Sequence, residues 1–495
     1  MKRSVLVVVP LAIVATLVLG GVWWLKFERQ PPAGELVAAK DSLGTRAAFA
    51  VAVHAPKSPG LRNVKVVLRT PSAAFPLAER SYNPGPLLGG GTRDDIVRVD
   101  ADLASLRVPE GAAQIEVVAE TYGWRLSGEG PTVVAQHPVV IDVTPPQVAV
   151  LSTQHNMRLG GASVAVFRAV GAERAEVLVG SYVFPATRGV FADADAWVGV
   201  FAVPQDLDTN VRVTVHATDT VGNASDVNIP VSIKGRRFPD RTLAVSEAFL
   251  QQKVPEIYAA NALAAPPDLV QGYLFINRDL RRQSEERLRA LTASTAPRPL
   301  WDGPFLRQPN AAPMSAFADR RAYEYRGAII DRQTHLGYDL ASLRHADVIA
   351  TQNGVVLLAG NLGIYGNTVV LDHGLGVFSL YGHLSAVTVQ QGQTVKAGEV
   401  VGQTGETGLA GGDHLHFSIM VAGRHVDPVE WWDPLWMRDH VAARFALLPL
   451  APAGGHDAPA PPADGTGEPA RPAAPSPGAT EARPSMLPAE AHSGV

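Results

Sequence analysis

The sequence predicts a multidomain, mainly β protein, and three observations support this fold class. Its 495 residues exceed what one hydrophobic core usually organises, since domains commonly hold ~100–200 residues. Over most of the chain, apolar residues fall in short valine-rich runs that Gly, Pro, Asn and Asp clusters separate, a pattern typical of β-sandwiches. Helical patterns are confined to an N-terminal apolar run and to one segment near the middle of the chain.

Composition limits the chemistry that is open to the chain. The 43 Lys and Arg against 47 Asp and Glu give a formal net charge of -4, and no basic block stands out, so nucleic acid is not an expected partner. The chain has no cysteine, which excludes disulfides and thiolate ligands. Any zinc site must therefore use His and carboxylate ligands.

Residues 1–30 predict an N-terminal signal anchor, that is, a transmembrane helix. Residues 4–25 carry no charge, and such a run is close to the ~20 residues that cross the hydrocarbon core as a helix. A cleavable signal peptide is the alternative, but its apolar core would be shorter, ~7–15 residues. Trp23 and Trp24 stand at the expected interface depth. We therefore expect a single-pass protein of the cytoplasmic (inner) membrane, with that membrane as a partner and the bulk of the chain on the periplasmic side.

Residues 31–144 and 145–236 are predicted to form two β-sandwich domains. The strand-breaking sequence Thr144-Pro145-Pro146 divides the valine-rich block between the two domains. The sequence Ala217-Thr-Asp-Thr-Val-Gly-Asn223 near the end of the second unit resembles the last hairpin of bacterial immunoglobulin-like domains, and the first unit resembles them more weakly. We interpret both units as spacers; exposed edge strands that bind a partner are the alternative.

Residues 237–300 are predicted to be a helical linker. Asp268 follows two prolines and can cap a helix start. Apolar residues then recur at spacings of four, three and four, as on one face of an amphipathic helix. These residues are Leu269, Tyr273, Ile276 and Leu280.

Residues 446–495 are rich in Pro, Ala and Gly and contain almost no large apolar residue. Such a composition cannot bury enough surface to offset the entropy lost on ordering. We predict a disordered C-terminal tail.

Residues 301–445 are predicted to form a compact antiparallel β domain. Short apolar runs between glycine turns indicate its strands. These runs are 354–359, 367–372, 376–381 and 414–421.

Histidines concentrate in three short motifs of this domain. His335 and Asp339 lie four residues apart around Gly337, where a tight bend would let both side chains reach one cation. His414 and His416 share one face of an extended strand because side chains alternate. Two imidazoles and one carboxylate, from His335, Asp339 and His416, are the ligand pattern of a catalytic zinc site. His383 and His414 would then be available to act on protons.

Together these motifs resemble the lysostaphin/LytM-type zinc metallopeptidases over about residues 320–432. The matching segments are His335-x-Gly-x-Asp339, Tyr381-Gly-His383-Leu384, Gly402-Gln-Thr-Gly-Glu-Thr-Gly408 and His414-Leu-His416-Phe417. The resemblance implies one zinc ion held by His335, Asp339 and His416. It also implies that His383 and His414 are the catalytic pair and that the substrate is a peptide bond in bacterial peptidoglycan.

The expected function is therefore that of a membrane-anchored zinc metalloendopeptidase that hydrolyses peptide cross-links of peptidoglycan during cell-wall remodelling. One alternative is a non-hydrolytic LytM-like scaffold that binds peptidoglycan or activates a separate cell-wall amidase, because some relatives of this kind have lost ligands. A third hypothesis is a module that only binds peptidoglycan without cleaving it. Other cell-envelope proteins are further candidate partners.

Several residues near the motifs have open roles. Asp413 precedes the His-x-His motif and could orient an imidazole or lie in a surface loop. Four residues before the first ligand are candidates for the peptide groove: Arg320, Arg321, Tyr323 and Tyr325. Three other histidines lack motif support and are expected to be structural or at the surface: His345, His373 and His425.

Overall fold

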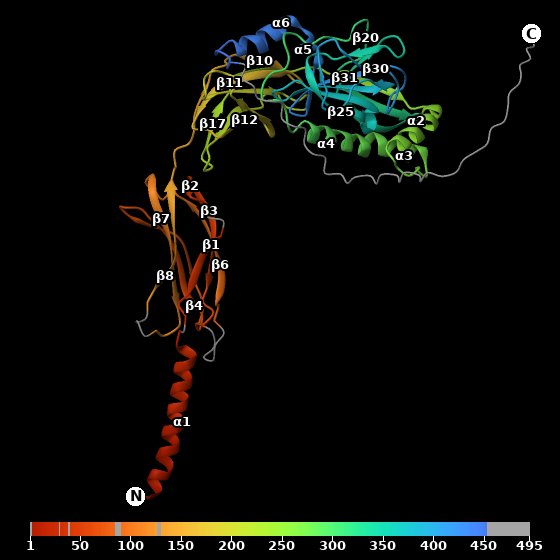
Figure 1. Ribbon diagram of the computed structural model, residues 1–495. Coiled ribbons are helices and arrows are strands. Elements are labelled where there is room, and N and C mark those ends of the chain that lie inside the picture. Colours follow the sequence, from red (N-terminus) through yellow and green to blue (C-terminus); the bar gives the residue numbers. More distant parts are fainter. Residues whose placement is uncertain (1, 29, 38–39, 85–90, 126–129, 453–495) are drawn as a thin grey trace, which may run out of the picture. The chain divides into compact units, whose positions relative to one another are not determined.

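The computed structural model describes residues 2–28, 30–37, 40–84, 91–125 and 130–452 (Figure 1). These residues belong to one compact unit, Met1–Pro459. The predicted disordered tail lies outside the described residues from 453 onward. Just before that point the chain is ordered against a β-strand region, since Ala451 N donates to Val190 O at 3.0 Å.

The N-terminal segment forms helix α1 (Lys2–Lys26). Among the residues that the structure describes, no helix combines the length and the apolar character needed to cross a membrane. The prediction of a transmembrane helix over 1–30 is therefore wrong. The predicted inner-membrane location and membrane partner, which depended on that helix, are withdrawn with it.

The mainly β, multidomain prediction is confirmed by the remaining elements. The strands of the first β region are β1 (Ala33–Val37), β2 (Ser42–Leu43), β3 (Arg46–His54), β4 (Leu61–Arg69), β5 (Ala74–Ser81), β6 (Asp94–Asp102), β7 (Gly111–Thr121) and β8 (Thr132–Ile141). They form two sheets, ordered β1-β3-β6 and β2-β8-β7-β4-β5. Alternate residues of β4 point into a shared core, among them Val64, Val66 and Leu68.

The second β region has strands β9 (Gln147–Val150), β10 (His155–Arg158), β11 (Ala162–Val170), β12 (Arg174–Val179), β13 (Tyr182–Pro185), β14 (Thr187–Arg188), β15 (Ala196–Ala202), β16 (Val213–Thr218), β17 (Ala224–Asn228) and β18 (Val231–Lys234). They form sheets ordered β14-β15-β11-β9, β13-β12-β16-β17 and β10-β18. The β16–β17 turn is closed by Asp219, whose Oδ1 accepts from the backbone N–H groups of residues 221–223 at 2.7–2.9 Å. The immunoglobulin-like assignment and the domain boundaries stay predictions.

The predicted helical segment contains strand β19 (Asp240–Ala244) and helices α2 (Glu247–Ala260), α3 (Leu269–Phe275), η1 (Ile276–Leu280, π) and α4 (Arg281–Leu291). Asp268 caps α3 as expected, because its side chain accepts from Gln271 N at 2.8 Å. The predicted apolar stripe is buried at Tyr273, Ile276 and Leu280.

The C-terminal region contains strands β20 (Ala312–Ser315), β21 (Asp319–Tyr325), β22 (Ala328–His335), β23 (Tyr338–Ala341), β24 (Asp347–Ile349), β25 (Gly354–Asn361), β26 (Asn367–Asp372), β27 (Val377–Leu384), β28 (Ala386–Val387), β29 (Thr394–Val395), β30 (Val400–Gln403), β31 (Leu415–Val421) and β32 (Arg424–Val426). Its helices are η2 (Gly363–Tyr365, 3-10), α5 (Pro428–Trp432), α6 (Pro434–Trp436), η3 (Met437–Ala442, π) and α7 (Ala443–Phe445).

The main sheet of this region has the order β20-β23-β31-β27-β26-β25-β29, with β32 paired to β31. Smaller sheets have the orders β19-β21-β22 and β24-β30-β28. Strand β19 pairs in parallel with β21, and the helices α2 to α4 that follow it lie along the main sheet in Figure 1. Helix and sheet residues share one hydrophobic cluster, which includes Leu288, Val370 and Leu380. The helical segment is therefore a layer of this region's fold.

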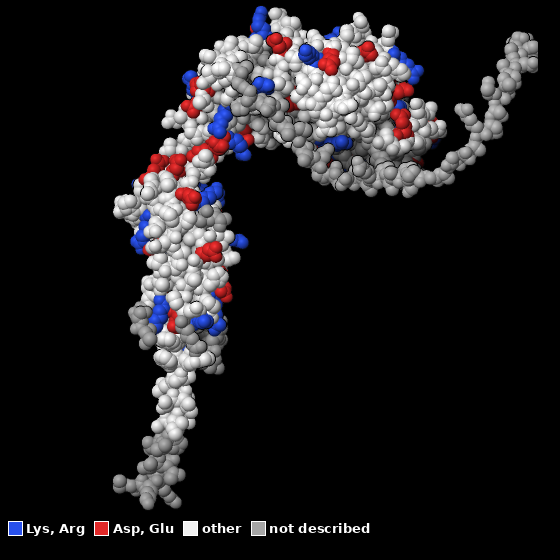
Figure 2. Space-filling view, viewed as in Figure 1, with Lys and Arg blue, Asp and Glu red and all other residues white. Residues whose placement is uncertain are grey.

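The surface carries a mixed charge pattern. On the face drawn in Figure 2, acidic and basic side chains are interspersed, in keeping with a formal net charge of only -4.

We predict that Leu288→Ala destabilises the main sheet as well as α4. Leu288 is fully buried, and removing a buried leucine side chain commonly costs about 2–5 kcal/mol. Hydrogen exchange followed by mass spectrometry should show faster exchange in β26 and β27. Leu343→Ala is the matched control because Leu343 is 82% exposed. Unchanged exchange in these strands would contradict a helical layer that shares its stability with the sheet.

Candidate metal centre

Three strand pairings bring the predicted ligands together. Asp339 in β23 stands opposite His416 in β31, and Gly382 in β27 stands opposite His416 on the other side. His335 is the last residue of β22, where it pairs with Asp319 of β21. Residues that lie up to 81 positions apart in the chain therefore meet at one end of the main sheet.

The three side chains converge on a single point. His335 Nε2 lies 2.9 Å from Asp339 Oδ1 and 3.0 Å from His416 Nδ1, and His416 Nδ1 lies 3.1 Å from Asp339 Oδ1. All three residues are buried, and their nitrogen and oxygen atoms form a group that could hold a metal ion. The prediction that these residues meet is confirmed; their role as ligands stays a prediction.

Backbone carbonyls fix how three imidazole rings are presented. His335 Nδ1 lies 3.2 Å from Ala316 O, His383 Nδ1 lies 2.8 Å from Thr407 O, and His414 Nδ1 lies 2.8 Å from Gly412 O. A carbonyl oxygen can only accept, so each Nδ1 carries the proton. In a neutral ring, Nε2 is thus left as the basic nitrogen.

His383 and His414 lie next to each other, beside the triad of His335, Asp339 and His416. Their ring centroids are 4.9 Å apart, and the His383 ring lies 5.7 Å from that of His416. His414 Nε2 is 3.7 Å from Asp339 Oδ1. The backbone of His383 has φ 62°, a left-handed conformation that costs a non-glycine residue about 1–3 kcal/mol. Strain of this size is concentrated at functional sites, and here it aims His383 toward His414.

Burial and neighbouring charge set the protonation states. Burial alone would raise the pKa of Asp339, but the coulombic effect of His335 and hydrogen bonds from His335 and His416 bring that pKa well below 3.8. Burial lowers the pKa of His416 to about 4 and, together with His414, lowers the pKa of His383 well below 6.5. A charged carboxylate and neutral imidazoles near pH 7 are the forms that bind metals.

A second carboxylate and two arginines stand behind the triad. Arg321 Nη2 donates to Asp339 Oδ2 at 3.0 Å, which leaves Oδ1 facing the histidines. Arg321 Nε lies 3.3 Å from Asp319 Oδ2, and Arg241 Nε lies 3.6 Å from the same oxygen. Asp319 is fully buried, and its Oδ1 has no hydrogen-bond partner among the described residues.

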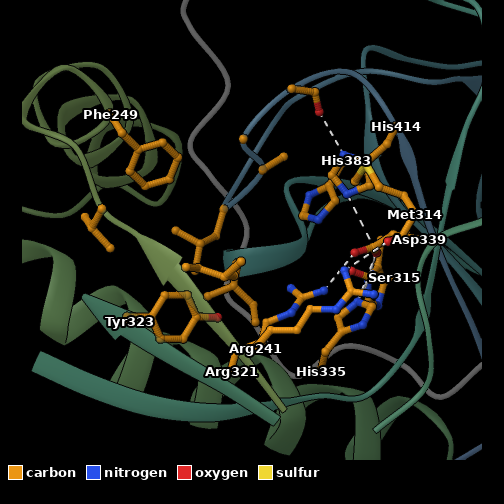
Figure 3. A pocket seen from close by; sticks show the side chains of 18 of the residues that line it. Arg241, Phe249, Met314, Ser315, Arg321, Tyr323, His335, Asp339, His383 and His414 are labelled. Carbon is orange, nitrogen blue, oxygen red and sulfur yellow. Dashed lines mark hydrogen bonds and ion pairs between the residues drawn. The ribbon is translucent and has the colours of Figure 1, made fainter. Parts of the chain in front are cut away.

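The triad opens into a cavity of about 530 Å³. Figure 3 shows Phe249 and Tyr323 across the cavity from Asp339 and His414, with Arg241 and Arg321 between them. One wall thus comes from β19 and α2, and the other comes from the loop before β31. The helical segment therefore contributes directly to the site.

The candidate groove residues divide by strand alternation. Arg321 and Tyr323 line the cavity, whereas Arg320 and Tyr325 do not. Arg241 and Asp319 were not predicted, because neither belongs to a motif. Because side chains alternate along a strand, the sequence could have predicted that Arg321 and Arg320 point to opposite faces of β21. The pairing of β21 with β19 could not be inferred from local sequence.

Asp413 does not orient an imidazole of the triad. Its Oδ1 accepts from Thr404 Oγ1 at 2.6 Å, and its Oδ2 accepts from His345 N at 3.2 Å, so it joins two loops. His373 is buried between Asn353 O and Ser379 Oγ, each 2.7 Å away, and has a structural role.

His425 is also buried and structural, since its Nε2 lies 3.1 Å from Glu285 Oε2 of α4. The side chain of His345 is half exposed. The interpretation of these histidines as structural or surface residues agrees with their contacts.

Residues 333–428 match the family model described as Peptidase family M23. DD-carboxypeptidase/endopeptidase Mpg of Neisseria meningitidis serogroup B is 43% identical over 95 residues, 19% of this chain and 22% of that protein. Peptidoglycan DD-endopeptidase ShyA of Vibrio cholerae is 38% identical over 96 residues, again 19% and 22%. Murein hydrolase activator NlpD of Salmonella dublin is 34% identical over 134 residues, 25% of this chain and 35% of that protein.

The matches span between about a fifth and about a third of these relatives. The family model covers the residues that hold His335, Asp339 and His416, so the chain carries an M23 peptidase domain of the LytM type, as the motifs indicated. The relatives named here include both peptidoglycan endopeptidases and a murein hydrolase activator.

We predict that Gly337→Ala weakens metal binding. A Cβ at position 337 would overlap Cε1 and Nε2 of His416 and would lie 2.8 Å from Ser418 Oγ, so the ring must move. A displaced ligand should lower zinc affinity by at least about 10-fold, measured by competition with a chromogenic chelator. Gly235→Ala is the control, because its Cβ would meet only Thr209 at 3.8 Å. Equal zinc affinities of the two variants would refute this role of Gly337.

We also predict that Arg321→Met lowers zinc affinity by about 10–100-fold, the usual effect of losing an outer partner of a ligand. Without Arg321, Asp339 Oδ2 loses its donor at 3.0 Å and the carboxylate is free to rotate. Arg320→Met, on the next residue but outside the cavity, serves as the control. If both variants bind zinc as the unmodified protein does, Arg321 does not position Asp339.

Proposed function

Because residues 333–428 form an M23 peptidase domain, we propose that the protein is a zinc metalloendopeptidase that hydrolyses peptide cross-links of bacterial peptidoglycan. One observation carries this proposal. Three ligand atoms lie within 3.1 Å of one another, and two further histidines stand beside them in the same cavity. Three protein ligands with an open position are typical of catalytic zinc sites.

The donor set fits zinc. His335 Nε2, Asp339 Oδ1 and His416 Nδ1 would hold the ion, and two imidazoles with one carboxylate suit a borderline-soft cation. When bound, zinc supplies a Lewis acid that polarises a carbonyl oxygen and lowers the pKa of a coordinated water.

His383 and His414 would carry the proton transfers. Their Nδ1 protons are held by Thr407 O and Gly412 O, so each Nε2 can take a proton from a water that attacks the scissile carbonyl. The protonated ring can then pass that proton to the leaving amine. The other imidazole can donate to the oxyanion that develops on the carbonyl when its own Nε2 is protonated.

A non-hydrolytic activator of a separate cell-wall hydrolase is the second candidate. The likeness to murein hydrolase activator NlpD over 134 residues favours it. The presence of all five predicted site residues in one cavity favours the enzyme.

We predict that the zinc-loaded full-length protein releases peptide fragments from cross-linked peptidoglycan. His416→Ala removes a ligand and should abolish this release, and so should a chelator, with activity restored by added zinc. Liquid chromatography with mass spectrometry of the products identifies the bond that is cut. If the zinc-loaded protein releases nothing by itself but accelerates a purified amidase, the activator proposal replaces the enzyme.

A further inference from the structure

We infer that Ser418 is a positioning residue, which accepts the Nε2 proton of His416 and so leaves the Nδ1 of that ring free to bind a metal ion. The inference deepens the proposed function. It rests on the zinc site proposed above, but it does not rest on the hydrolysis of peptidoglycan. Ser418 lies just outside the motif that supplies His414 and His416, so the sequence pattern did not single it out.

His416 presents the opposite ring nitrogen from the other imidazoles of the site. His335, His383 and His414 each place Nδ1 against a backbone carbonyl oxygen. The Nδ1 of His416 instead faces the ligand group, 3.0 Å from His335 Nε2 and 3.1 Å from Asp339 Oδ1. A neutral imidazole carries one proton, so a ring that binds a metal ion through Nδ1 carries that proton on Nε2. This ring therefore needs an acceptor beside Nε2.

Ser418 supplies the acceptor. Its Oγ lies 3.4 Å from His416 Nε2, and within the described part of the chain this oxygen is the hydrogen-bond partner of that nitrogen. The two residues share a face of β31 because side chains alternate along a strand. Ser418 is fully buried and His416 is only 4% exposed, so bulk water is a poor substitute for the hydroxyl.

A second hydrogen bond sets the direction of the hydroxyl group. Ser418 Oγ donates to Leu336 O at 2.7 Å, and a carbonyl oxygen can only accept. With its own proton committed to Leu336, the hydroxyl can only accept from the His416 ring. The contact with Nε2 is long and therefore weak, so the shorter bond to Leu336 is what makes Ser418 select one tautomer of His416.

The same hydroxyl joins two segments that carry ligands. Leu336 stands between His335 and Gly337, whereas Ser418 follows His416 on β31. A Cβ on Gly337 would lie 2.8 Å from Ser418 Oγ and 2.4 Å from His416 Nε2, so the bend, the ring and the hydroxyl occupy adjoining space. Removal of the hydroxyl leaves the ring packed in place but takes away the contact that selects its tautomer.

The test measures zinc affinity and ring protonation in the purified full-length protein. Ser418→Ala should lower zinc affinity by about 10–100-fold, the usual effect of losing the outer partner of a ligand, in competition with a chromogenic chelator. NMR of the zinc-loaded protein with isotope-labelled histidine should show the His416 proton on Nε2, identified by its absence from His416→Ala. In zinc-loaded Ser418→Ala, the resonance of this proton should move upfield because its hydrogen bond is lost.

Ser379→Ala is the matched control. Ser379 is also fully buried in the main sheet, and its Oγ lies 2.7 Å from Nε2 of His373, which is outside the ligand group. This variant should lose stability and keep its zinc affinity. Unchanged zinc affinity of Ser418→Ala, equal losses of affinity in the two variants, or a His416 proton on Nδ1 in the zinc-loaded protein would each overturn the inference.

The outcomes also separate the inference from the proposed function. If the unmodified protein binds zinc but releases no peptide fragments, the proposed hydrolysis fails. A lower zinc affinity of Ser418→Ala than of Ser379→Ala would then still support the role of Ser418. If the unmodified protein binds no zinc, the metal site and the inference fail together.

Discussion

The structure depends on one constraint: a carboxylate oxygen and two imidazole nitrogens from three strands must be held about 3 Å apart inside the protein. Without an ion, a buried carboxylate pays a desolvation cost that only paired charges and hydrogen bonds offset. The imidazoles supply part of this compensation, and Arg321 donates a further hydrogen bond to Asp339 Oδ2. The ends of β22, β23 and β31 are therefore held together by these side-chain interactions as well as by backbone pairing.

The sheet alone could not build the site. The main sheet supplies Asp339, His383 and His416, but His335 and Arg321 come from the small β19-β21-β22 sheet. That sheet is joined to α2 through β19, and the helices bury their apolar face on the main sheet. The helical segment therefore fixes the orientation of the second sheet and, through it, two of the groups around the cavity.

The residue pattern predicted the separate motifs because each of them is local, and the family resemblance implied that they meet. A strand presents His414 and His416 on one side, and Gly337 gives the space that the His416 ring needs. Glycine is needed at position 337 because a Cβ there would collide with the His416 ring, rather than because of the bend that the sequence suggested. The Arg241–Asp319 contact and the packing of α2 to α4 were not predictable, because they depend on the long-range pairing of β19 with β21. The transmembrane prediction was wrong, since no helix among the described residues is long and apolar enough to cross a membrane.

Among the residues that the structure describes, Oδ1 of the buried Asp319 has no hydrogen-bond partner. A buried acceptor without a partner costs about 1–3 kcal/mol, and hydrophobic packing would avoid that cost. Its Oδ2, however, is shared by Arg321 and Arg241, one directed at the ligand Asp339 and the other at the cavity. One buried carboxylate thereby sets the positions of both guanidinium groups. The two guanidinium groups are therefore coupled, because a change at either arginine alters the charge that faces the other.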